Sequence, residues 1–123
     1  WSSDVCSSDL AAGELKHGTI SLIDEDVPVI AVATQTGIIP KTISNVVEVK
    51  SRGAKVILVC TDACARELKD GVADYVIEIP HTDELLMPIT AVVPLQILAY
   101  YTSINRGIDP DKPKNLAKSV TVE

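Results

Sequence analysis

The sequence has few of the residues that would direct it to nucleic acid. It contains 11 lysine and arginine residues against 17 aspartate and glutamate residues, which gives a net charge of -6 at pH 7. It has no basic stretch that could neutralise a row of phosphates. We therefore expect no nucleic-acid partner.

The cysteines are too few and too irregularly spaced for a disulfide framework or a zinc site. There are three of them, Cys6, Cys60 and Cys64, and the spacing in "CTDAC" fits neither a redox C-x-x-C motif nor a zinc knuckle. Reduced thiols of this kind are typical of the cytosol. We expect a cytoplasmic protein with free thiols and no metal site.

One long apolar run lies in the second half of the sequence. Residues 85–101 carry no charge, which makes the run marginal for crossing a bilayer, and it includes Pro88, Pro94 and Gln96. We predict a buried helix here, and no membrane partner.

The first ten residues, "WSSDVCSSDL", differ in composition from all that follows. They are rich in serine and aspartate and lack the basic start and long apolar run of a secretory signal. The string is similar to translated sequencing-adaptor sequence, so we interpret residues 1–10 as a non-native or disordered leader. A genuine flexible terminus is the alternative.

Three short runs rich in valine and isoleucine predict β-strands at residues 27–34, 55–61 and 74–80. The first two runs are apolar at nearly every position, as expected for strands that are covered on both faces of a parallel sheet. We expect them to pair in chain order, with the first run left as an unpaired edge strand.

Helical segments are predicted between and after these runs. Residues 40–53 have apolar side chains at helical spacing, with a proline to begin the helix and a glycine to end it. Residues 62–71 form a shorter crossover, and a last helix lies between residues 83 and 107, with a kink at Pro94. Residues 11–24 predict a loop with a short helix, because two glycines interrupt the pattern.

The fold class that follows is α/β, with a length of 123 residues that suits one domain. We predict a partial three-layer α/β/α sandwich, with about three strands of a doubly wound parallel sheet. Sheets of this kind usually have more strands, so we expect part of the fold to be missing.

Two stretches carry a family resemblance: "AAGELKHG" at residues 11–18, and "VPLQILAYY" continuing through "RGIDPDKPKNLAKSVTVE". They closely resemble the carboxyl-terminal end of the glutamine-fructose-6-phosphate aminotransferase (isomerising) family. The resemblance covers residues 11–123. It implies that residues 11–114 are part of the second sugar-isomerase (SIS) domain, and that residues 115–123 are a catalytic tail.

The resemblance also implies a chemistry. The family makes glucosamine 6-phosphate from fructose 6-phosphate and glutamine-derived ammonia by acid-base steps without a cofactor. His17 falls on the ring-opening histidine, which acts across a homodimer interface, and an imidazole can take and give a proton near neutral pH. Lys118 falls on the lysine of the closing tail, with Ala117 beside it as a substrate contact. Glu14 and Lys16 are expected to support His17.

The role of Lys118 stays open at this point. An ammonium group can bind a sugar oxygen, stabilise an oxyanion or form a Schiff base with an open-chain ketose. Without the resemblance, both His17 and Lys118 would be taken for ordinary surface residues. His81 lies before a predicted helix that Thr82 or Asp83 could cap, which indicates a structural role.

Two functions from different classes fit these observations. One is a fragment of the aminotransferase that is inactive alone, because the glutaminase domain and the first isomerase domain are not in the sequence. The alternative is a stand-alone sugar-phosphate-binding module with a regulatory role. A lysine-bearing tail that closes over a sugar favours the enzyme fragment.

Overall fold

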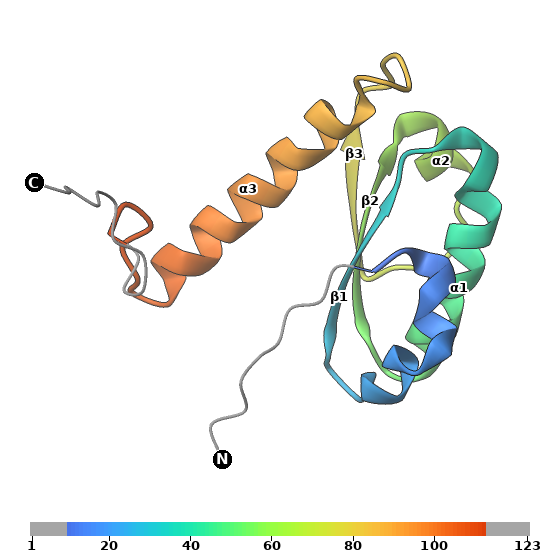
Figure 1. Ribbon diagram of the computed structural model, residues 1–123, viewed down its shortest axis with the longest axis horizontal. Helices are drawn as coiled ribbons and strands as arrows, with labels where there is room; N and C mark the ends of the chain where they lie inside the picture. Colours follow the sequence, from blue (N-terminus) through green and yellow to red (C-terminus); the bar gives the residue numbers. More distant parts are fainter. Residues whose placement is uncertain (1–9, 113–123) are drawn as a thin grey trace, which may run out of the picture.

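The computed structural model describes residues 10–112, which form a three-stranded sheet with helices on both faces (Figure 1). The elements, in chain order, are η1 (Ala12–His17), η2 (Thr19–Leu22), β1 (Pro28–Ala33), η3 (Thr36–Ile38), α1 (Ile39–Ser51), β2 (Lys55–Thr61), α2 (Asp62–Glu67), β3 (Tyr75–Ile79) and α3 (Met87–Asn105).

The sheet is parallel throughout and its strands follow one another in the order β1-β2-β3. Ala33 of β1 pairs with Cys60 of β2, and Cys60 pairs with Glu78 of β3. The predicted strands, their order and the α/β class are thereby confirmed. Within residues 10–112, β1 is an edge strand as expected, and β3 is the other edge.

The main core lies between the sheet and α1. Val56, Leu58 and Cys60 alternate along β2 and are fully buried on this face, where they belong to one cluster with Val46 and Val49 of α1. Alternate residues of a strand lie on one face of the sheet, and residues three apart in a helix lie on one side of the helix. The apolar face of β2 and the apolar side of α1 therefore pack against each other. Burial of this cluster holds α1 on the sheet.

The opposite face of the sheet is only partly covered. Figure 1 shows α1 and α2 on one side of the sheet and α3 on the other, with α3 running away from the strands. In α3 only Met87 and Ala91 are buried, in a cluster with Val59 and Ile79. Leu95 also packs against this cluster, so the helix is anchored through its first half.

The expectation of a buried helix at residues 85–101 is wrong for this chain. The helix forms, but only 11% of its most apolar stretch is buried. A sheet of three strands is too narrow to cover 19 residues of helix, which explains the exposure. By length and composition alone, α3 could also cross a membrane.

Proline begins both long helices. Pro40 lies in the first turn of α1 and Pro88 in the first turn of α3. Proline has no backbone N–H, and none is needed there because the N–H groups of the first turn have no acceptor within the helix. Pro94 lies inside α3, which continues through it to Asn105.

A side-chain cap on α3 is not found where the sequence predicted one. Leu86 is the N-cap residue, and no side chain caps the helix. The carboxylate of Asp83 instead accepts the Leu85 N–H at 2.9 Å and closes the preceding turn. Thr82 turns its hydroxyl to the sulfur of Met87 at 3.3 Å.

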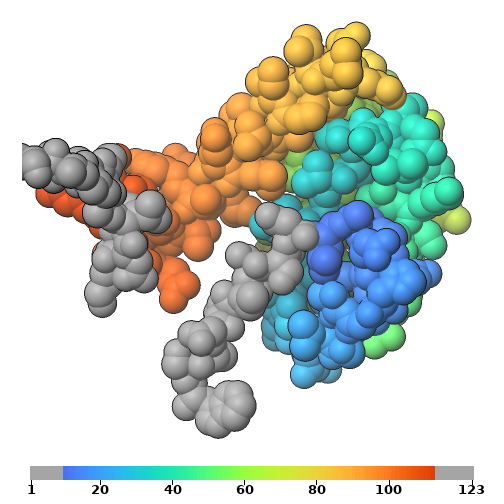
Figure 2. All heavy atoms as spheres, viewed as in Figure 1, coloured from blue at the N-terminus to red at the C-terminus, as the bar shows by residue number. Residues whose placement is uncertain are grey.

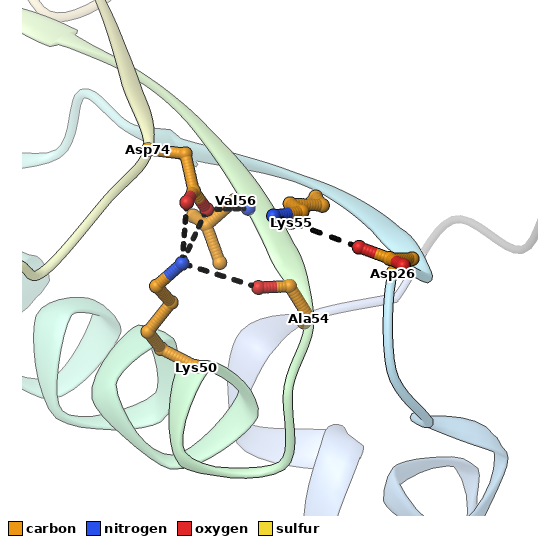
Figure 3. A network of polar contacts seen from close by, with 6 residues as sticks. All are labelled: Asp26, Lys50, Ala54, Lys55, Val56 and Asp74. Carbon is orange, nitrogen blue, oxygen red and sulfur yellow. Dashed lines mark hydrogen bonds and ion pairs between the residues drawn. The ribbon is translucent and has the colours of Figure 1, made fainter.

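An ionic network joins the end of α1 to the start of β2 and β3 (Figure 3). The Lys50 Nζ lies 2.5 Å from both carboxylate oxygens of Asp74, and the two side chains are 29% and 23% exposed. Asp74 is bonded twice to Val56: its carboxylate accepts the Val56 N–H at 2.7 Å, and its own N–H donates to the Val56 carbonyl at 2.9 Å. The Lys50 ammonium and the Val56 N–H hold the pKa of Asp74 below its ordinary value.

We predict that Asp74→Asn lowers the urea midpoint of unfolding at pH 7. The pKa of Asp74 is lower in the folded state than in the unfolded state, so its ionised form stabilises the fold above the ordinary value of 3.8. This stabilisation is lost as the pH falls from 3.8 through the lowered folded value. Urea unfolding at neutral and at acid pH should therefore show the difference from the unsubstituted chain shrinking in acid.

The control is Asp70→Asn, which removes an exposed carboxylate from the loop before β3. It should leave the midpoint nearly unchanged at both pH values. A loss in Asp74→Asn that is equally large at neutral and at acid pH would contradict the ionic account.

Candidate functional site

His17, the first predicted site residue, ends the short helix η1. The side chain of Leu15 packs against the buried cluster between α1 and the sheet, and this contact holds η1 in place. Lys16 forms an ion pair with Glu48 of α1, with its Nζ 3.0 Å from Oε2. The two side chains are 54% and 36% exposed, so the pair orients η1 more than it stabilises the fold.

The chain turns sharply directly after His17. Gly18 has a φ of 136°, which a residue with a side chain rarely adopts. Its carbonyl oxygen accepts two hydrogen bonds from Ser21, from the N–H at 3.0 Å and from the hydroxyl at 2.6 Å. This turn leaves the imidazole of His17 exposed at the surface.

The supporting residues of His17 do not surround it. The backbone N–H of Glu14 donates to the carbonyl of Ala11 at 2.8 Å and closes the first turn of η1, while its side chain is exposed. Lys16 is paired with Glu48 and not with the histidine. Their support of His17 therefore stays a prediction.

The other predicted site residues, Ala117 and Lys118, lie outside the described residues, as does the tail at 115–123. Within the described part of the chain, η1 and α3 lie on opposite sides of the sheet (Figure 1). The helix that leads toward the tail and the helix that ends in His17 are thus separated by the sheet.

The carboxyl ends of the three strands form a polar edge that sequence reasoning did not single out. Thr34 follows β1, Thr61 ends β2, and His81 and Thr82 follow β3. Ligands of parallel sheets bind beyond this end of the strands. The available signal was a threonine at the end of each valine- and isoleucine-rich run.

The threonine at the end of β2 has a structural role as the N-cap of α2. Thr61 is buried, and its Oγ1 accepts the N–H of Cys64 at 3.4 Å, which caps α2. His81 is exposed. Of the polar residues at this edge, those after β1 and β3 are the ones a ligand could reach.

Two shallow cavities lie elsewhere in the described part of the chain. The larger, about 420 Å³, is formed at the end of α3 by Tyr100, Ile104, Gly107, Ile108, Asp109, Pro110 and Asp111. The smaller, about 250 Å³, lies between α2, the loop after it and β3. Neither of these two cavities is lined by η1.

The structure offers no metal centre in residues 10–112, because no three His, Cys, Asp or Glu side chains there come together as ligands. Acid-base chemistry by single side chains is what η1 can supply.

The thiols of Cys60 in β2 and Cys64 in α2 are not suited to act as nucleophiles. Cys60 and Cys64 are free and buried. Burial, with smaller effects from Cys64 and Glu78, raises the pKa of Cys60 to about 12, and burial also raises the pKa of Cys64. Since a thiolate is the reactive form, both side chains act as small apolar residues of the core.

The chain is similar to a known domain and to known enzymes. The family model of the SIS domain matches residues 5–106. The chain is 52% identical over 117 residues to the glutamine-fructose-6-phosphate aminotransferase [isomerizing] of Clostridium perfringens, and 55% identical over 119 residues to that of Lactiplantibacillus plantarum. These matches cover 95% and 97% of this chain but 19% of each relative. The chain thus spans about a fifth of the length of these curated relatives.

A solved structure shows the same fold. The C-terminal domain of glucosamine-fructose-6-phosphate aminotransferase from Francisella tularensis superposes with a TM-score of 0.74 and 35% sequence identity. The superposition covers 80% of this chain and 27% of that chain. Most of the solved domain therefore has no counterpart in the chain.

We predict that Cys60 and Cys64 react with a thiol reagent only when the fold opens. In a Cys6→Ser background, labelling at pH 7 should be slow in buffer and rapid in urea, because neither thiol is exposed or ionised in the folded chain. The control is Ser44→Cys in the same background, which puts a thiol on the exposed side of α1 and should label rapidly. Rapid labelling of Cys60 in buffer would contradict the assignment.

Proposed function

Because this chain belongs to the SIS domain family, we propose that it is part of the isomerase portion of a glutamine-fructose-6-phosphate aminotransferase. Such an enzyme makes glucosamine 6-phosphate from fructose 6-phosphate and glutamine-derived ammonia. The observation that carries the proposal is the 52% identity over 95% of the chain. The fold alone would not carry it, since one fold hosts many functions.

In this proposal, His17 opens the sugar ring. The imidazole takes the proton of the anomeric hydroxyl and a proton is returned to the ring oxygen as the ring carbon–oxygen bond breaks, which gives the open-chain ketose. Two features support this role: the histidine is exposed at a helix end, and the turn at Gly18 fixes the backbone beside it. Lys16, anchored on Glu48, and Glu14 position η1.

His17 is proposed to act in the site of the neighbouring subunit of a homodimer. The support is the position of η1, which lies across the sheet from α3 and lines neither of the two cavities described above. An exposed histidine on the side of the sheet opposite to α3 is suited to serve another chain.

The tail is proposed to complete the site. Residues 115–123 would close over the sugar and exclude water, with Ala117 and Lys118 in contact with the substrate. Lys118 would bind a sugar oxygen, stabilise an oxyanion or form an imine. The sugar phosphate is bound by other parts of the enzyme, so the 123-residue chain alone is inactive. We place the whole enzyme in the cytoplasm.

For the test of His17, the control is Arg52, an exposed residue at the end of α1, away from the carboxyl ends of the strands. In the complete enzyme, His17→Ala should slow turnover of cyclic fructose 6-phosphate by roughly two to four orders of magnitude, the usual contribution of general acid-base catalysis. An analogue that cannot form a ring should lose far less, because it needs no ring opening. Arg52→Ala should leave both rates unchanged.

The turnover rates of both variants on both substrates test whether His17 serves ring opening. Equal losses on the cyclic and the open-chain substrate in His17→Ala would remove the histidine from ring opening. Binding of fructose 6-phosphate with no turnover in the unsubstituted enzyme would favour a regulatory sugar-binding module instead.

For the tail, Lys118→Ala in the complete enzyme should abolish most synthesis, and Lys118→Arg should restore little of it, because a planar guanidinium cannot replace a compact amine. Lys112→Ala, at an exposed lysine before the tail, is the control and should stay active. Removing residues 115–123 should stop synthesis while the melting temperature hardly changes. An active Lys118→Ala with a large fall in melting temperature on deletion would make the tail a packing element.

A further inference from the structure

The helix that ends in His17 has little intrinsic stability. η1 is a 3-10 helix of six residues, none of its residues is buried, and no side chain caps its first turn. Short helices of this kind have poor hydrogen-bond geometry and do not persist without tertiary contacts. The position of His17 therefore depends on the contacts that η1 makes with the rest of the domain.

Two neighbouring side chains attach η1 to the domain, and they differ in kind. Leu15 packs against the buried cluster between α1 and the sheet. Lys16 places its Nζ 3.0 Å from Oε2 of Glu48. An apolar contact has no preferred direction, so Leu15 alone leaves η1 free to turn about its own axis. The ion pair joins two particular atoms, and it directly precedes His17.

Glu48 is a firm partner for this pair. It belongs to α1, in which Val46 and Val49 on either side of it are buried in the core. Its carbonyl oxygen accepts the hydroxyl of Ser51 at 2.7 Å, within the last turn of the helix. Figure 2 shows η1 (blue) against α1 (teal) at the surface of the molecule, away from α3 (orange). The Glu48 carboxylate thus links a loosely held helix to one that the core holds.

We propose that Glu48 is a positioning residue for the proton transfer by His17. It touches no reacting atom. Its charge holds Lys16, and through Lys16 it fixes the direction in which η1 presents the imidazole to the sugar ring. This inference rests on the proposed function, in which His17 opens the ring.

The effect of this pair is expected in catalysis and not in global stability. Both side chains are partly exposed, and exposed ion pairs add little to the free energy of unfolding. A short surface helix, however, opens locally without unfolding the domain. A general base works only within hydrogen-bond reach of its proton, and a displacement of about 1 Å can slow a reaction by roughly a hundredfold.

The test uses the complete Clostridium perfringens enzyme in which residues 11–123 of this chain replace the matched region. Glu48→Gln removes the charge and keeps the size of the side chain, Lys16→Met removes the other charge, and a third variant carries both changes. The control is Asp26→Asn, which breaks the exposed pair that Asp26 forms with Lys55 at 3.5 Å, at the amino end of the sheet.

We expect Glu48→Gln to lower kcat for cyclic fructose 6-phosphate about fivefold, the upper range for an ion pair this exposed. KM should hardly change, because Glu48 does not touch the substrate. An analogue that cannot form a ring should be turned over at nearly the normal rate. The double variant should lose no more than the larger single loss, because both changes remove one interaction. Asp26→Asn should keep the normal kcat.

Hydrogen exchange of the backbone amides of residues 12–18 measures the same effect without turnover. In Glu48→Gln these amides should exchange faster, while those of α1 and the melting temperature stay as they are. Asp26→Asn should leave the exchange of residues 12–18 unchanged. Because exchange requires no reaction, it reports on the link between Glu48 and η1 even if the proposed function fails.

The two proposals fail in different ways. Equal losses of His17→Ala on the cyclic and open-chain substrates would contradict the proposed role of His17. If His17→Ala shows the expected contrast, an unchanged kcat in Glu48→Gln would overturn the positioning role. Equal losses of Glu48→Gln on both substrates, or losses that add in the double variant, would also overturn it, since the two residues would then act separately or elsewhere.

Discussion

The burial of β2 on both faces is the constraint on which the rest of this structure depends. Its residues from Val56 to Thr61 lie between two other strands, beneath α1 on one face and α3 on the other. Parallel strands need such cover, because each connection between them places a helix on a face. The contacts of Asp74 with Val56 and Lys50 fix where β3 begins against this strand. The order of the sheet and both cores follow from that arrangement.

The same constraint explains which surfaces of the described fold are left uncovered. Three strands are wide enough for α1 to cover its face, but they support only the first half of α3. Ile30 and Val32 of β1 are exposed on the α3 side of the sheet, and β1 is an open edge among the described residues. An exposed apolar face next to an open edge is a site where more polypeptide packs.

The sequence was most informative where local physics decides the structure. β-branched residues predicted all three strands to within one or two residues, and Pro40 marked the start of α1. Within the predicted crossover at 62–71, α2 ends at Glu67 and the chain continues as a loop to β3. The exposure of α3 could not be predicted, because an apolar run has the same sequence whether or not its cover is present.

The candidate site was much less accessible to sequence reasoning. Nothing in the pattern around His17 distinguishes it from an ordinary loop histidine, and only the family resemblance pointed to it. The structure adds the turn at Gly18 and the Lys16–Glu48 pair, which explain how η1 is held. The threonines at the strand ends, by contrast, were visible in the sequence and were not recognised as one edge.

The most direct test of this account is the rate at which the complete Clostridium perfringens enzyme makes glucosamine 6-phosphate when residues 11–123 of this chain replace its matched region. The account predicts synthesis at a rate comparable with that of the parent enzyme, and none from the 123-residue chain alone. A chimera that keeps the melting temperature of the parent and binds fructose 6-phosphate, yet makes no product, would contradict it.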